Sequence, residues 1–207
     1  MEHQLFAQIR NQPEEVSIFH MCTTWSNIWY LVWQPSVPSH VGNGITAWIE
    51  CDVVQAGICW FIRQAAQGKT VVYAGAIKQV KALAQQLRCA AYSRETVDKP
   101  GVLNQFIDGQ SQVIAATSAL GMGVDIPDIR LVIHMGTPYT LLDHAQESGQ
   151  AGCDRQPSIA VIIQPMRWDM PPVWMEDTPG HKLQQMQRYM DGQCQWQMLD
   201  QHLDRHH

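Results

Sequence analysis

Short apolar runs alternate with segments of helical periodicity along most of this chain, and this alternation limits the folds that it can adopt. Strand-like apolar runs occupy residues 28–33, 71–74, 89–92, 112–117, 131–134 and 159–163. Apolar residues at helical spacing lie between several of these runs, at residues 47–67, 77–87, 102–106 and 141–147. Strands that alternate with helices are typical of a parallel sheet buried on both faces. The sequence therefore predicts an α/β, three-layer fold with helices on both sides of a central, mostly parallel sheet.

The size and charge of the chain exclude several classes of protein. Its 207 residues, 45% of them hydrophobic, are enough for one main domain with a buried core. A formal net charge of -5 provides no overall basic field for nucleic acid, so any such binding has to be local. No segment reaches the roughly 18 consecutive apolar residues of a membrane helix, and we expect no membrane partner. Six cysteines without a C-x-x-C pair are typical of reduced, intracellular thiols.

The tripeptide Gly68-Lys69-Thr70 has the ending of a phosphate-binding loop. The full pattern requires a glycine at the position of Arg63. In such a loop the lysine follows a strand and opens a helix, whereas here the apolar run 71–74 follows the lysine. We therefore interpret the tripeptide as a turn that enters a strand.

The most specific pattern is VIAATSALGMGVDIPDIRLVIH (residues 113–134), followed by QESGQAGCDRQPS (residues 146–158). A strand ends at Thr117, and Gly121 and Gly123 follow it closely. Glycine has no Cβ, so the backbone can approach a nucleic-acid phosphate there, while Thr117 can offer its hydroxyl. Asp125, taken by itself, fits an ordinary turn between two strands.

These stretches resemble the second RecA-like lobe of superfamily 2 helicases, and in particular of the RecQ family. The fragments VVYAG (71–75), AAYS (90–93), FIDG (106–109) and TTWSNIWY (23–30) are similar to further motifs of that lobe. The resemblance covers about Phe19 to Ile163. It implies three parts: a remnant of the first lobe or linker (1–18), the RecA-like helicase C-terminal lobe (19–165) and the truncated start of a zinc-binding helical subdomain (166–207).

The resemblance also implies ligands and residue roles. ATP and Mg²⁺ are the cofactors, and the partners are single-stranded or forked DNA and a first helicase lobe. The implied nucleotide-binding residues are Gly123, Asp125 and Gln146. The implied DNA-binding residues are Tyr73, Thr117, Ser118 and Gly121. The implied location is nuclear if the source is eukaryotic and otherwise intracellular, with a role in DNA unwinding and repair.

The chain departs from the family where the sixth motif faces the nucleotide, at Gln146, Gly149, Gln150, Gly152 and Cys153. The family has two arginines at the positions of Gln150 and Cys153, which stabilise charge on the transferred phosphate; arginine fingers contribute on the order of 10³ to 10⁵ in rate. Neither neutral side chain replaces a guanidinium group. Arg155 lies two residues past the second position, where the family has a glycine. We therefore predict that this chain does not use ATP on its own.

Cysteine side chains also take part in nucleophilic catalysis and in zinc binding. Cys153 could be a catalytic thiol with His134 or His144 as its base, but the sequence shows neither a placed base nor a cause for a lowered pKa. Cys194 is a single candidate zinc ligand, and four-coordinate closure with the terminal histidines is not expected.

The departures from the family are all of one kind of substitution. Tryptophan, serine, glutamine or cysteine stands where the family has arginine or proline, at Trp25, Ser26, Trp29, Gln150 and Cys153, and single C-to-T or G-to-A changes in the codons would produce them. Our hypothesis is a pseudoenzyme, a mutationally decayed copy similar to the RecQ-like copies of fungal chromosome ends. Two functions remain open: the second motor lobe of a RecQ-like ATP-dependent 3'-5' DNA helicase, inactive alone, or a non-catalytic nucleic-acid or protein interaction module. The cations available for DNA contact are few, namely Lys69, Lys78, Arg94 and Arg130. We therefore expect weak DNA binding, with dissociation constants of about 10⁻⁴ M or higher.

Overall fold

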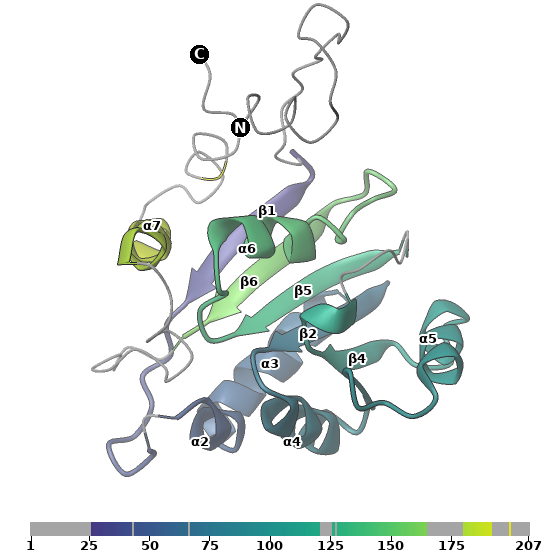
Figure 1. Cartoon of the computed structure of the whole chain (residues 1–207), viewed down its shortest axis with the longest axis horizontal. Helices are drawn as coiled ribbons and strands as arrows, with labels where there is room; N and C mark the ends of the chain where they lie inside the picture. The colour runs from purple at the N-terminus through teal and green to yellow at the C-terminus, as the bar shows by residue number, and fades with distance from the viewer. Residues whose placement is uncertain are drawn as a thin grey trace, which may run out of the picture.

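The computed structural model describes residues 26–42, 44–65, 67–120, 126, 128–164, 180–191 and 199. A six-stranded sheet forms the centre of this part of the chain (Figure 1). Its strands are β1 (Ile28–Trp33), β2 (Lys69–Ala74), β3 (Ala90–Tyr92), β4 (Val113–Ala116), β5 (Ile129–Met135) and β6 (Ser158–Ile163). They lie in the order β1-β6-β5-β2-β4-β3, and every neighbouring pair is parallel.

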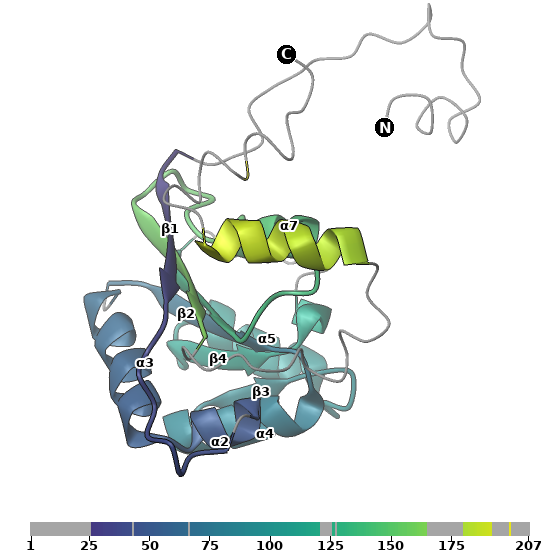
Figure 2. The same ribbon diagram turned by 90° about the vertical axis from the view of Figure 1, so that its left-hand side faces the viewer.

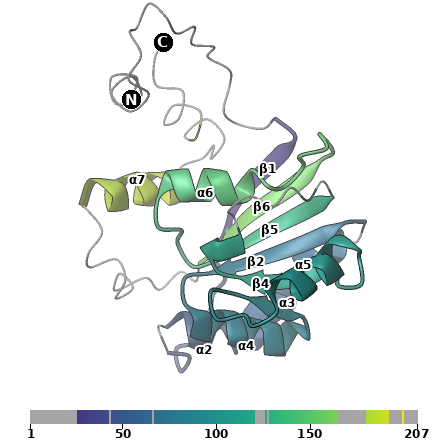
Figure 3. The same cartoon turned by 45° about the vertical axis from the view of Figure 1, so that its right-hand side comes forward.

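Helices cover both faces of the sheet because alternate residues of each strand point to opposite sides. On one face Val72 and Ile133 pack with α2 (Ile45–Ile49), α3 (Asp52–Gln64) and α4 (Ile77–Leu87). On the other face Val71 and Val132 belong to the core formed with α5 (Lys99–Ile107), α6 (Leu141–Ser148) and α7 (Gly180–Asp191). Figures 2 and 3 show α6 and α7 together on this second face. The predicted α/β, three-layer fold is confirmed.

The largest difference from the sequence prediction concerns the helix expected at residues 47–67. The chain forms two helices there, because Cys51 is extended (φ -78°, ψ 126°) and begins α3 as its N-cap. Gln55 bridges the break by donating from Nε2 to the carbonyl of Ile49 at 3.1 Å. Trp48 and Val54 are both buried in the same core, so the apolar periodicity continues through the break and does not reveal it.

The remaining strands and helices agree with the predicted ones to within a few residues. Gly68-Lys69-Thr70 is confirmed as the entry into a strand, since β2 begins at Lys69. Helix α5 begins earlier than predicted, where the Asp98 side chain accepts a hydrogen bond from the Gly101 amide at 2.9 Å. Among the described residues, no helix combines the length and apolar character that a membrane span requires.

The parallel arrangement sorts the motifs onto two opposite edges of the sheet. Strands β2 and β4 end near Tyr73 and Thr117 at the carboxyl edge, whereas Lys69 and Ser158 begin strands at the amino edge. Helix α6 returns the chain from the carboxyl end of β5 toward the start of β6. The polar turn at residues 149–157 therefore lies at the amino edge.

Candidate functional site

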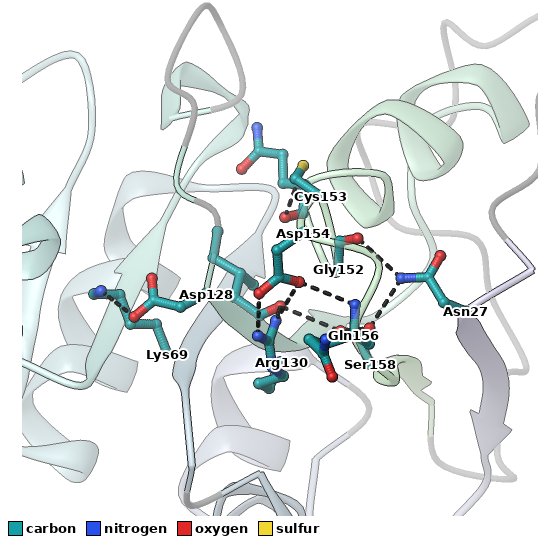
Figure 4. A network of polar contacts seen from close by, with 11 residues as sticks. Asn27, Lys69, Asp128, Arg130, Gly152, Cys153, Asp154, Gln156 and Ser158 are labelled. Atoms are coloured by element: carbon teal, nitrogen blue, oxygen red, sulfur yellow. Dashed lines mark hydrogen bonds and ion pairs between the residues drawn. The ribbon is translucent and has the colours of Figure 1, made fainter.

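The turn at residues 149–157 is fastened to the start of two strands. Gly152 adopts a left-handed backbone (φ +66°) and donates from its amide to the carbonyl of Ile129 at 3.0 Å. Its own carbonyl accepts a hydrogen bond from Nδ2 of Asn27 at 2.9 Å, and the same nitrogen reaches the carbonyl of Gln156 at 2.9 Å. The hydroxyl of Ser158 donates to the Ile129 carbonyl at 3.3 Å. Figure 4 shows these contacts converging on the turn.

Two ion pairs, formed by Lys69 and Arg130, lie at this edge. The Arg130 guanidinium donates to both carboxylate oxygens of Asp154, with 3.1 Å between Nη1 and Oδ1 (Figure 4). The hydrogen bond from Arg130 lowers the pKa of Asp154. Lys69, whose side chain is 6% exposed, lies 2.5 Å from Asp128. Lys69 is therefore buried and paired at the edge of the sheet opposite Thr117, and it is not a free cation for DNA.

The predicted sixth-motif residues lie together on α6 and in the following turn. Gln150 accepts a hydrogen bond from the Tyr73 hydroxyl at 3.0 Å. Burial, and secondarily the Glu147 carboxylate, raise the pKa of Tyr73, so this hydroxyl stays protonated and donates. The Cys153 thiol contacts the carbonyls of Gly149 and Gln150 at 3.4 and 3.5 Å. Gln146 is exposed on α6, and both positions expected to carry arginine hold neutral side chains with protein partners.

A cavity of about 360 Å³ opens at the carboxyl edge of the sheet. Its walls combine aromatic, hydroxyl and acidic side chains, among them Tyr73, Ser118, His134, Tyr139, Asp143 and Glu147. Of the predicted DNA-binding residues, Tyr73 and Ser118 line this cavity, and Thr117 directly follows the last residue of β4. The predicted residues Gly121, Gly123, Asp125 and Cys194 lie outside the described residues. Among the residues that are described, no group of three His, Cys, Asp or Glu is arranged to hold a metal ion.

Two buried histidines lie at this cavity, His134 in its wall and His144 beside His134, and both are hydrogen-bonded to groups other than Cys153. His134 pairs through Nε2 with Oε2 of Glu147 at 2.9 Å, and its ring stacks on Tyr73. His144 is fully buried between the Tyr189 hydroxyl at 2.8 Å and the Ser148 hydroxyl at 3.2 Å. Burial, with a smaller contribution from His134, lowers the pKa of His144 well below its usual value.

No pattern in the sequence indicated that Asn27, Arg130 and Asp154 hold the turn. Asn27 lies 125 residues from Gly152, and Arg130 lies 24 residues from Asp154. No local periodicity relates positions that far apart, so these contacts become visible only in the folded chain.

Arg155 offers a test of the turn, because it adopts a left-handed backbone (φ +66°). This conformation is strained in any residue with a Cβ and lowers the stability of the folded chain. We expect Arg155→Gly to raise the free energy of unfolding by roughly 0.5–1 kcal/mol, since glycine adopts this backbone without strain. Urea denaturation of both proteins measures the change. Arg63→Gly, in the last turn of α3, is the control and should lower the free energy of unfolding, by at most about 1 kcal/mol. A loss at both positions would show that the Arg155 side chain stabilises the turn.

Comparison with known proteins agrees with this architecture. Residues 53–155 match the family model described as helicase conserved C-terminal domain. The chain is similar to the Escherichia coli DEAD-box protein SrmB, with a TM-score of 0.52, 17% identity and coverage of 66% of this chain and 76% of that chain. A DEAD box protein from Methanococcus jannaschii gives a TM-score of 0.50 and 19% identity over 66% of this chain and 36% of that one. These structural likenesses show the fold alone.

Sequence relatives specify the branch of helicases. RecS of Bacillus subtilis, named as a probable ATP-dependent DNA helicase, is 40% identical over 106 residues, 47% of this chain and 21% of that protein. The human ATP-dependent DNA helicase Q4 is 37% identical over 44% of this chain and 7% of its own length. RecQ of Haemophilus influenzae is 29% identical over 62% of this chain and 24% of its own length. This chain therefore spans no more than about a quarter of these relatives, and it contains the C-terminal lobe of a RecQ-like superfamily 2 helicase.

Proposed function

We propose that this chain is the second motor lobe of a RecQ-like ATP-dependent 3'-5' DNA helicase and that it does not hydrolyse ATP by itself. The observation that supports the proposal is the residue type and the contacts of Gln150 and Cys153. Both stand where the family has arginine, and both side chains contact other protein groups, the Tyr73 hydroxyl and backbone carbonyls.

The charges around the turn do not fit the γ-phosphate of ATP. Phosphoryl transfer needs fixed cations where negative charge develops. Arg130 forms a bidentate ion pair with Asp154. The exposed Arg155 lies two residues past Cys153, the second position where the family has arginine. We therefore assign no catalytic step to this turn, and ATP and Mg²⁺ are cofactors of the family that this lobe does not use alone.

DNA binding is the second part of the proposal. Tyr73, Ser118 and Thr117 gather at the carboxyl edge, where the family contacts the strand. The same cavity is lined by Asp143 and Glu147, and carboxylates repel phosphate groups. We propose weak, salt-sensitive contact with single-stranded or forked DNA.

ATP hydrolysis by the purified chain, with and without single-stranded DNA, tests the catalytic part. We expect no DNA-stimulated turnover from the wild-type chain. The double variant Gln150→Arg/Cys153→Arg should be equally inactive, because a phosphate-binding loop is not among the motifs of this lobe. DNA-stimulated turnover by the wild-type chain would contradict the proposal, and turnover by the double variant alone would show that the two arginines were the only missing parts.

A non-catalytic interaction module is the second candidate, and one observation favours it. Trp29 and Leu31, neighbours on one side of β1, are 67% and 38% exposed. A salt titration of DNA binding separates the two functions, because phosphate contacts weaken steeply with salt and apolar contacts do not. Absence of any salt-dependent DNA binding would favour the interaction module.

A further inference from the structure

The edge strand β1 lacks the features that normally keep a strand from pairing with another molecule. Its sequence, IWYLVW, contains no charge, no proline and no glycine. Proteins protect an edge strand with charged residues, proline, bulges or a covering element. Segments of about six residues with high β-propensity and no charge pair readily with copies of themselves. β1 therefore has the composition of a pairing strand.

The hydrogen-bonding groups of β1 face two directions. The carbonyls of Asn27 and Trp33 accept hydrogen bonds from the β6 side, from Ser158 and Gln164. Because alternate residues of a parallel strand point to the same neighbour, the N–H and C=O groups of Ile28, Tyr30 and Val32 point away from β6. Among the described residues, no strand pairs with this outer edge (Figure 2).

The side chains of β1 are covered unequally. Ile28 and Tyr30 are buried in the core under α6 and α7. On the opposite side, Trp33 is covered by α3, where its ring packs edge-on against Phe61 with 6.0 Å between the ring centroids. Trp29 and Leu31 share that side with Trp33 and remain 67% and 38% exposed.

We propose that this edge binds a second copy of the chain, through antiparallel pairing of β1 with β1 around a twofold axis at Tyr30. In this register Tyr30 faces its own copy, and Ile28 faces Val32 of the second copy, so that all outward-pointing backbone groups are paired. Trp29 then lies opposite Leu31 of the second copy, and Leu31 lies opposite Trp29. One register therefore covers both exposed side chains at once.

The charges permit this self-association. Opposing strands carry no like charges, which would otherwise destabilise the pair. The net charge of -5 on each chain repels at long range, and salt screens this repulsion. The dimer should therefore become tighter as salt rises, which is the opposite of DNA binding, and this proposal does not depend on the helicase function.

Sedimentation equilibrium over a concentration series tests the dimer. We expect reversible dimerisation that strengthens between about 150 mM and 1 M salt, where the Debye length falls from about 8 to 3 Å. Trp29→Lys and Leu31→Glu should each weaken it by about tenfold or more, because each places a charge opposite an apolar side chain. Ile107→Lys is the control, because Ile107 is 41% exposed on α5, which packs beside the far edge strand β3, and it should leave the dimer unchanged.

Mixing the two variants tests the register. Trp29→Lys and Leu31→Glu chains should form a heterodimer tighter than either homodimer, because lysine then opposes glutamate and the remaining tryptophan opposes leucine. Failure of the mixture to recover association would overturn the proposed pairing. Equal unfolding transitions confirm that the variants are folded.

Hydrogen exchange of the wild-type chain tests the same edge without substitution. The amides of Tyr30 and Val32 should become protected as concentration rises. Protection at every concentration in a monomer would show that another segment of the same chain covers β1. A monomer with unprotected amides would show that copies do not pair, and either result would overturn the proposal.

Discussion

Replacing Gly152 with alanine should lower the free energy of unfolding by about 2–4 kcal/mol, the sum of left-handed strain and lost hydrogen bonds. A Cβ at this position would lie 2.3 Å from Nδ2 of Asn27 and 2.9 Å from the carbonyl oxygen of Gln156. The backbone at Gly152 is also left-handed, with φ +66°. The new methyl group would therefore displace Asn27, which ties the turn to the start of β1 (Figure 4). Urea denaturation followed by circular dichroism measures the loss.

Gly109→Ala separates the two causes. Gly109 has a similar left-handed backbone (φ +76°), but the nearest atom to a Cβ there is Nε2 of Gln112 at 3.5 Å. The free energy of unfolding of this variant should fall only by the cost of the left-handed backbone, about 1–2 kcal/mol. Equal losses at Gly109 and Gly152 would show that the Asn27 contacts do not stabilise the turn.

Acidification from pH 7 to pH 5 should destabilise the wild-type chain through His144 by up to about 2 kcal/mol, since each pH unit below the unfolded-state pKa of about 6.5 corresponds to about 1.4 kcal/mol. The pKa of this ring is well below 6.5 in the folded chain, mainly because of burial. Below pH 6.5 the unfolded chain binds a proton that folded His144 does not take. Stability is therefore complete above this pH and falls as pH drops toward the folded pKa.

Chemical denaturation at several pH values measures this slope in the wild-type chain and in His144→Gln. Three titratable groups face the ring: His134, Tyr189 and Tyr30. Burial raises the pKa of Tyr30 to about 12, so it stays neutral throughout the range. His134, which is paired with Glu147, is present in both proteins, so the difference between their slopes isolates His144. The exposed His40 provides the control variant His40→Gln, which should keep the wild-type slope. An unchanged slope in His144→Gln would contradict the assignment.

Local patterns were sufficient to predict most of the fold. The apolar runs around Val71, Ile114 and Leu131 predicted parallel strands because residues buried on both faces have to be apolar along their whole length. Helix α4 was predicted with its observed bounds, Ile77–Leu87. The break between α2 and α3 was missed because Trp48 and Val54 enter the same core on both sides of it. Apolar periodicity indicates which face of a helix is buried. Where the chain breaks one helix and starts another with the same buried face, the apolar pattern does not change, and the break cannot be predicted from it.

The motif around Thr117 and the neutral side chains of Gln150 and Cys153 were also readable from the sequence, because they depend on residue type at a position. The contacts that individual side chains make could not be read from the sequence. Lys69, counted from the sequence as a cation available to DNA, is buried beside Asp128, and Arg130 is engaged by Asp154. The sequence by itself determined the layered fold, the helicase lobe and the neutral residues at positions 150 and 153, since these follow from order and composition along the chain. Only the tertiary structure decided which charges remain free, what holds the turn at Gly152 and which edge of the sheet stays open, because each depends on contacts between residues far apart in sequence.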